Sequence, residues 1–231
     1  PNLQTPPITT ISLPSIFLNH NSIHKAPACL KHLPHVIADE TKRLRFQVEK
    51  VLQMSVFDNS DSSALKFTEV DANRIVENVV NTFKIKVEKF GGSISSCLDA
   101  ENAMISVDEM HFTNIIYNLL DNAVKYMRED TEPHLKITTR DIDGSRLEIR
   151  ISDNGIGIKK EDLKKIFEKF YRVSTGNRHD VKGFGLGLAY VKKMVTIFDG
   201  SIRAESELGK GSDFIITLPL IPDGNEGGSG K

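Results

Sequence analysis

The sequence predicts an α+β protein in which a helical N-terminal third precedes a larger α/β part. Residues 36–57 carry apolar or small residues at alternating steps of four and three, the spacing of a coiled-coil or bundle seam. After the polar stretch DNSDSS at 58–63, strand-like alternation and helical periods follow each other. We therefore expect a helical hairpin over 1–60, an α/β domain over 61–222 and a flexible tail over 223–231.

The helical third is too small to bury its own seam. The helix at 36–57 needs a partner, which the apolar stretch 8–18 can supply, with 19–27 as the connecting turn. Because two helices bury little surface, we expect a second copy of the chain to complete a four-helix bundle. Pro14 and Pro34 remove backbone donors, so kinks or non-helical starts are expected there.

Each expected element of the α/β part has a local signal. Asp71 and Asp108 precede amphipathic segments and suit the N-cap position of a helix. The Asp143-Gly144 pair predicts the tight turn of a β-hairpin over 135–152. The remaining elements are expected as strands at 65–70, 93–98, 103–107, 201–206 and 213–218, and as helices at 160–170 and 186–198.

Composition limits the classes of function. The chain has 231 residues, of which 39% are hydrophobic and 26% charged, as in an ordinary globular protein. The formal net charge of -1 gives no basic field for nucleic acid, and no apolar run approaches the ~20 residues of a membrane span. We therefore expect no nucleic-acid partner and no membrane contact by this chain. Cys29 and Cys97 form no CxxC pair, which favours free thiols in a reducing, cytoplasmic compartment.

Four polar residues share one face of the helix that follows Asp108. Asn114, Asn118, Asn122 and Lys125 are spaced by four, four and three residues. A carboxamide oxygen is a suitable ligand for Mg²⁺, and a lysine can neutralise a phosphate. The alternative is a solvated helix face with an ordinary asparagine content, and the stripe alone does not decide between the two.

Two glycine-rich segments extend this pattern. DNGIGI at 153–158 directly follows a strand, so that Asp153 can accept from an exocyclic amino group and favour adenine over guanine. GFGLGL at 183–188 opens an apolar helix whose free N–H groups suit a polyphosphate. Between them, the cation-rich segment 172–182 is a candidate lid. A plain Asn-Gly turn and a glycine hinge without ligand are the alternatives.

The motifs NIIYNLLDNAVKY, DNGIGI, FEKFYR and GFGLGL follow in this order between Asn114 and Leu188. Together they resemble the ATP-binding domain of sensor histidine kinases, the group that shares its fold with gyrase and MutL. The resemblance covers residues 65 to about 219. It implies an α/β sandwich with a mixed sheet and helices on one face, the histidine-kinase ATPase fold, and it implies ATP and Mg²⁺ as ligands.

The resemblance also implies roles for single residues. Asn122 would hold Mg²⁺ with Asn118 beside it, and these two with Lys125 would form the catalytic set. The nucleotide-binding residues that it implies are Asn118, Asn122, Lys125, Tyr126, Asp153, Gly155, Gly157, Ile158, Phe170, Arg172, Lys182, Gly183, Gly185, Leu186, Gly187 and Thr217.

The helical third resembles the dimerisation and phosphoacceptor hairpin of the same family but lacks its acceptor. In the family the acceptor histidine is followed by an acidic residue and, five positions on, by a proline. Aligning Pro7 with that proline places Asn2 and Leu3 at the first two positions. An amide has no basic ring nitrogen that can attack a phosphoryl group. The other histidines of this region lack those neighbours, and their spacing at most permits zinc: His20, His24, His32 and His35.

The resemblance implies the core of a sensor histidine kinase. Such a core moves the γ-phosphoryl group of Mg-ATP to a histidine and then to an aspartate of a response-regulator receiver domain. It further implies a cytoplasmic fragment of a membrane-anchored sensor that pairs with a second copy of itself. Two alternatives stay open. The missing acceptor favours a nucleotide-gated regulatory module, whereas a gyrase-like ATPase is disfavoured because Asn118 stands where the water-activating carboxylate would be.

Overall fold

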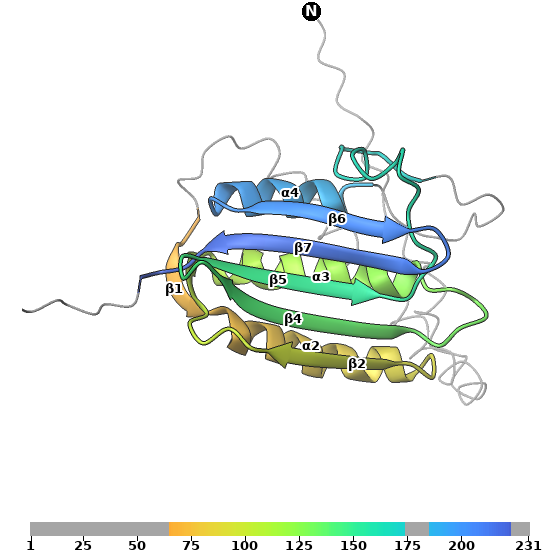
Figure 1. The fold of residues 1–231 in the computed structure, drawn as a ribbon, viewed down its shortest axis with the longest axis horizontal. Helices are drawn as coiled ribbons and strands as arrows, with labels where there is room; N and C mark the ends of the chain where they lie inside the picture. The colour runs from red at the N-terminus through yellow and green to blue at the C-terminus, as the bar shows by residue number, and fades with distance from the viewer. Residues whose placement is uncertain (1–64, 174–184, 223–231) are drawn as a thin grey trace, which may run out of the picture. The chain divides into compact units, whose positions relative to one another are not determined.

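In the computed structural model, which describes residues 65–173 and 185–222, three helices cover one face of a five-stranded sheet (Figure 1). These residues belong to one compact unit of the chain, which spans residues 52–231. The expected hairpin over 1–60, the boundary at 58–63 and the tail over 223–231 lie outside the described residues. The α+β class and the helices on one face of the sheet are confirmed.

The sheet is mixed. Its strand order is β2-β4-β5-β7-β6, and only β2 and β4 pair in parallel within the described part of the chain. The bounds of the five strands are Ser93–Leu98 for β2, His134–Ile142 for β4, Arg146–Asp153 for β5, Ser201–Glu207 for β6 and Gly211–Pro219 for β7. The hairpin of β4 and β5 turns where predicted, since Asp143 and Gly144 have φ angles of 52° and 63°.

Two of the three described helices begin where their capping residues predict. Asp71 caps α2 (Ala72–Glu88) by accepting from the backbone N–H of Asn73 at 2.9 Å. Asp108 caps α3 (Glu109–Lys125), and α4 runs from Gly187 to Ile197. Among the described residues, no helix is both long enough and apolar enough to pass through a bilayer.

The core lies between the sheet and the helices. On β5, Leu147, Ile149 and Ile151 are buried at every second position, and they pair in register with Leu218, Ile216 and Phe214 of β7. The helices contribute their apolar stripes, including the fully buried Ile115, Leu119 and Leu120 of α3. A smaller antiparallel pair, β1 (Thr68–Asp71) and β3 (Met104–Val107), lies outside the five-stranded sheet.

Charged side chains cover the opposite face of the sheet. Glu148 points to this face, yet its side chain is only 4% exposed. Its carboxylate lies 2.8 Å from Arg140 on the neighbouring strand β4 and 3.7 Å from Arg203 on the edge strand β6. Arg150 continues the network to Asp213 at 2.8 Å. In the described part of the chain the arginine stems shield this face, and no second layer of helices lies over it.

The helix predicted at 160–170 is wrong. The segment is a series of turns, with bonds from Lys165 N–H to Asp162 C=O and from Glu168 N–H to Lys165 C=O, each three residues back. Phe170 has a φ of 64°, and its N–H donates to Gly185 rather than to the preceding turn. A long-range backbone bond therefore overrides the helical propensity of this lysine- and glutamate-rich segment.

Candidate functional site

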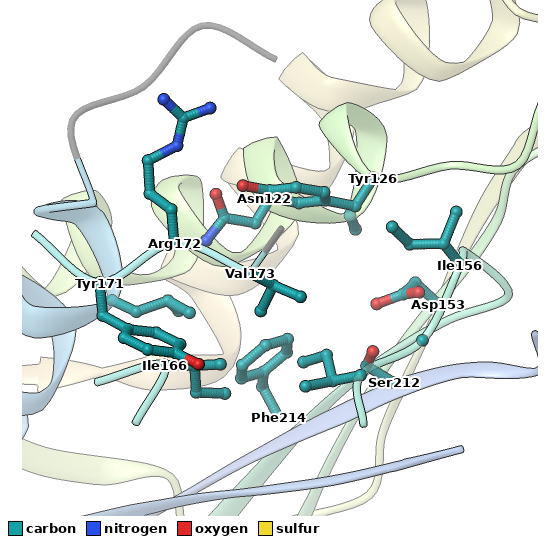
Figure 2. Close-up of a pocket in the computed structure, with 14 residues that line it drawn as sticks. Asn122, Tyr126, Asp153, Ile156, Ile166, Tyr171, Arg172, Val173, Ser212 and Phe214 are labelled. Carbon is teal, nitrogen blue, oxygen red and sulfur yellow. The ribbon is translucent and has the colours of Figure 1, made fainter. Parts of the chain in front are cut away.

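A pocket opens between the C-terminal half of α3, the loop after β5 and the beginning of β7 (Figure 2). Most of its wall is apolar, and the polar exceptions include Asn122, Asp153, Arg172 and Ser212. Its lining residues are Asn122, Ala123, Tyr126, Asp153, Ile156, Gly157, Ile158, Ile166, Tyr171, Arg172, Val173, Leu188, Ser212 and Phe214. A largely apolar cleft with few polar groups suits a flat aromatic ligand that carries hydrogen-bond donors.

Asp153 ends β5 and turns its carboxylate into the pocket (Figure 2). Burial raises the pKa of this carboxyl to about 6, although hydrogen bonds from the backbone of Gly155 and Ser212 oppose the rise and Asp213 adds to it. Its Oδ1 accepts from Gly155 N–H at 2.8 Å, which fixes the side chain in an Asx turn. The result is an oriented, partly desolvated acceptor for a ligand amino group.

The two glycines after Asp153 let this loop approach its neighbours closely. A Cβ on Gly155 would lie 2.5 Å from the carbonyl oxygen of Tyr126, to which Ile156 N–H donates at 2.9 Å. Gly157 has a φ of 69°, and a Cβ there would lie 2.1 Å from the carbonyl oxygen of Glu207. The loop is thus held between the end of α3 and the β6–β7 turn, and only glycine fits at these two positions.

The asparagine stripe of α3 meets a different partner at each step. Asn114 hydrogen-bonds the buried hydroxyl of Tyr190 on α4, and that hydroxyl lies 2.8 Å from His111 Nδ1. Asn118 Nδ2 donates to the carbonyl oxygen of Asn114 at 2.7 Å. Its Oδ1 lies 3.1 Å from the position that a Cβ on Gly187 would take. Asn122 reaches the pocket (Figure 2). The stripe therefore runs from the α3–α4 contact to the pocket.

The N-terminus of α4 lies beside this stripe. Leu186 occupies the N-cap position and supplies no side-chain hydrogen bond, so within the described residues no side-chain cap is found at the start of α4. Gly187 is the first helical residue and faces Asn118. A helix N-terminus next to amide oxygens can receive an anion together with its cation.

Residues 171–173, which follow the FEKF segment, line the far wall of the pocket. The Tyr171 hydroxyl donates to Asp162 Oδ1 at 2.5 Å, and this bond raises the pKa of Tyr171 to about 12. Arg172 and Val173 also line the pocket, and Val173 projects between Asn122 and Phe214 in Figure 2. The predicted lid thus begins at the pocket wall, whereas residues 174–182 lie outside the described residues.

The structure brings six of the predicted residues to the pocket: Asn122, Tyr126, Asp153, Gly157, Ile158 and Arg172. Four more lie outside the pocket lining, Asn118 in the middle of α3 and the others in a loop or at the start of α4: Asn118, Gly155, Gly185 and Gly187. Leu186 is buried at the start of α4, whereas Lys182 and Gly183 are not among the described residues.

Three predicted residues do not reach the pocket. The Phe170 ring is 64% exposed on the outside, and Lys125 pairs with Asp121. Thr217 pairs in register with Glu148 on the charged face of the sheet, because side chains of β7 alternate and Ser212 and Phe214 take the pocket face.

Sequence reasoning missed most of the apolar wall. The residues concerned are Ala123, Ile156, Ile166, Tyr171, Val173, Leu188, Ser212 and Phe214. For β7 a signal was available. Ser212 and Phe214 have the same parity as Ile216 and Leu218, which pair with the apolar residues of β5, whereas Thr217 pairs with Glu148, so the period of two assigns Ser212 and Phe214 to the helix-covered face.

The family of histidine kinase-, DNA gyrase B- and HSP90-like ATPases matches residues 107–222. Sensor protein RprX of Bacteroides fragilis (strain YCH46) is 57% identical over 215 residues, which is 93% of this chain and 41% of RprX. The chain therefore spans less than half the length of this relative.

Solved structures have the same fold. Full-length ShkA in complex with AMPPNP is 24% identical, with a TM-score of 0.69 over 84% of this chain and 40% of ShkA. Histidine kinase ThkA in complex with response regulator protein TrrA is 25% identical, with a TM-score of 0.60 over 86% of this chain and 54% of that one. From the family match, the relatives and the fold, the chain belongs to the histidine kinase-, DNA gyrase B- and HSP90-like ATPases and, within them, to the sensor histidine kinases.

Proposed function

We propose that this pocket binds ATP with Mg²⁺ and that the chain is the catalytic core of a histidine kinase. The observation that carries the proposal is the position of two groups on one apolar pocket. Asp153 offers an oriented acceptor at the end of β5, and Asn122 offers an amide from α3 (Figure 2). In this arrangement adenine lies against the apolar wall and its amino group donates to Asp153.

The phosphates extend toward the N-terminus of α4. In the described part of the chain that end has no side-chain cap, and it lies next to Asn118, so its N–H groups can receive an anion. The donor set also fits Mg²⁺, because the amide oxygens of Asn122 and Asn118 are hard ligands on one helix face. When bound, the cation would neutralise charge on the β- and γ-phosphates. Arg172, at the pocket rim, is placed to add positive charge from the lid side.

The proposed reaction moves the γ-phosphoryl group to a histidine and then to an aspartate of a response regulator. Two neighbours support this: ShkA was solved with AMPPNP, and ThkA was solved with the response regulator TrrA. The proposed partners are accordingly a receiver domain and, through the N-terminal third, a second copy of this chain. Because Asn2 stands at the acceptor position, the histidine would come from another chain or from the group at His20–His35.

Asn2 in place of an acceptor histidine also favours a second candidate, a nucleotide-binding regulatory module that transfers no phosphoryl group. A hydrolase is the weaker reading. Asn118 holds the position beside Gly187, and its amide donates to the Asn114 carbonyl, so no carboxylate is supplied there to activate water.

Incubation with γ-labelled Mg-ATP tests the proposal, with Asn122→Ala and the matched control Asn78→Ala, an exposed asparagine of α2. Acid-labile label on the wild type and on Asn78→Ala, but not on Asn122→Ala, supports a histidine kinase. Mg²⁺-dependent binding without label identifies the regulatory module, and steady phosphate release without a partner identifies a hydrolase. Absence of nucleotide binding by the wild type would contradict the proposal.

A further inference from the structure

Three charged side chains form a cluster on the side of α3 next to the asparagine stripe. Asp121 accepts from Lys86 of α2 at 2.5 Å and also from Lys125, four residues further along α3. The Asp121 side chain is 21% exposed, and Lys86 also lies over the rings of Phe83 and Tyr117, 4.9 and 6.0 Å from their centroids. These ring contacts hold Lys86 in place. For Lys125, the ion pair with Asp121 is the one contact found among the described residues.

Helix geometry leaves Lys125 a choice between two neighbours. At about 100° per residue, Lys125 is rotated by about 60° from Asn122 and by about 40° from Asp121, in opposite directions. Asn122 faces the pocket and Asp121 faces α2. The long lysine stem can therefore turn its ammonium to either side with little backbone change.

We propose that Asp121 and Lys86 are positioning residues for nucleotide binding: Asp121 withholds Lys125 from the phosphates, and Lys86 weakens that hold. This inference rests on the proposed nucleotide site. When phosphates enter, Lys125 exchanges one anionic partner for another. Lys86 then stays with Asp121, so the half-buried carboxylate is not left without a counter-ion.

The acidity of Asp121 agrees with this arrangement. Burial favours the neutral acid, but hydrogen bonds and charge from Lys125 and Lys86 outweigh it and hold the pKa of Asp121 below its usual value. The carboxylate therefore stays ionised at neutral pH and remains a constant competitor for Lys125.

The two positioning residues predict opposite effects on affinity. Asp121→Asn releases Lys125 toward the pocket, so ATP should bind more tightly. Lys86→Met keeps the packing on Phe83 but leaves Asp121 with Lys125 as its one cation in this cluster, so ATP should bind more weakly. Partly exposed ion pairs of this kind correspond to changes of about two- to five-fold in the dissociation constant.

Calorimetric titration of a set of variants with Mg²⁺ and a non-hydrolysable ATP analogue tests the inference. Asp121→Asn and Lys86→Met are measured alone and each in a Lys125→Met background, where both effects should vanish. Lys86→Arg, which restores the charge, should bind as the wild type does. Glu109→Gln, which removes an exposed carboxylate from the first turn of the same helix, is the charge control and should change nothing.

The possible outcomes separate this inference from the proposed function. Opposite shifts in the dissociation constants of Asp121→Asn and Lys86→Met that vanish in the Lys125→Met background support the inference. Equal shifts, shifts in the same direction or shifts that persist in Lys125→Met overturn it, even while the wild type and Asn78→Ala bind the analogue. If Asp121→Asn fails to fold, Lys86→Met with its Lys86→Arg rescue decides alone. If the wild type does not bind the analogue, the proposed function itself has failed.

Discussion

The backbone N–H of Phe170 donates to the carbonyl oxygen of Gly185 at 2.9 Å. The chain positions on either side of residues 171–184 are therefore in direct contact. Phe170 takes a φ of 64° to make this bond, and Gly185 has a φ of 71°. A Cβ on Gly185 would lie 2.7 Å from the carbonyl oxygen of Tyr171, the residue that begins the far wall of the pocket.

Gly185→Ala should push the backbone at residue 185 away from Phe170 and Tyr171 and weaken nucleotide binding. The added methyl group meets backbone that cannot move aside cheaply, so stability should fall by about 1–3 kcal/mol. Urea unfolding and nucleotide titration measure the two effects. Gly144→Ala is the matched control, because Gly144 has a φ of 63° but nothing within 4 Å of the added Cβ. A loss of about 1 kcal/mol with unchanged affinity is expected there; equal behaviour of both variants would contradict the argument.

Asp153→Asn should stabilise the nucleotide-free protein at pH 8. The native state holds this proton more tightly than the unfolded chain, because the pKa is about 6 instead of 3.8. The stabilising contribution is fully present below pH 3.8 and is lost as the pH rises through 6. Removing the ionised group at pH 8 should therefore gain about 2–3 kcal/mol. Thermal unfolding from pH 4 to 8 checks this, with the 82%-exposed Asp130→Asn as control. A gain independent of pH would exclude this cause.

The affinity for adenosine should fall as the pH is lowered through 6. The ionised carboxylate of Asp153 is the stronger acceptor for the amino group, and below pH 6 it becomes neutral. Adenosine is the ligand of choice because it has no phosphate that titrates in the same range. In Asp153→Asn, affinity should be lower throughout and flat between pH 5 and 8. A slope that survives in this variant would mean that another group controls binding.

Tyr190→Phe should loosen α4 against α3. The hydroxyl bridges Asn114 and His111 from a residue that is 3% exposed, so its removal leaves two polar groups without this partner. A loss of about 1–3 kcal/mol is expected. Tyr117→Phe serves as the comparison, since the Tyr117 ring packs on Phe83 with centroids 4.8 Å apart. Urea unfolding should find the smaller change for Tyr117→Phe, and the reverse order would refute the role of the Tyr190 hydroxyl.

Glu148→Gln should reduce stability without touching nucleotide binding. The substitution leaves Arg140, Arg150 and Arg203 on the charged face without their shared carboxylate, which is nearly buried. Because the arginines remain solvated, losing this shared carboxylate should lower stability by about 1–2 kcal/mol. Glu205→Gln, whose side chain is 54% exposed, should change stability by less than about 1 kcal/mol. Affinity equal to that of the wild type at a temperature where both are folded completes the test.

Most of the fold could be predicted because its signals are local. Asp71 and Asp108 stand directly before the helices that they cap, and Asp143-Gly144 adopts the positive φ angles that its turn requires. The segment 160–170 could not be predicted in this way. Its state depends on the bond between Phe170 and Gly185, and no local propensity records a partner fifteen residues away.

The polar half of the site could be predicted and the apolar half could not. Asn122 and Asp153 are identifiable because an amide at helical spacing and a carboxylate before Asn-Gly-Ile-Gly are unusual in a core. Ile156, Ile166 and Phe214 look like ordinary core residues, since the same burial that fills a core also lines a pocket. The spacing puts Lys125 on the asparagine face of α3, but its side chain pairs with Asp121, and this pairing depends on how α2 packs.

The asparagine stripe makes this site sensitive to changes in chain length as well as to changes in residue type. Asn114, Asn118 and Asn122 reach Tyr190, Gly187 and the pocket in successive steps of about 6 Å along α3. Inserting one residue between Asn114 and Asn122 would turn everything beyond it by about 100° and shift it by about 1.5 Å. The helix could remain intact, but the asparagines beyond the insertion would no longer face the groups that they contact now. Variants in this stretch should therefore arise by substitution, whereas insertions and deletions are tolerated only in the loops.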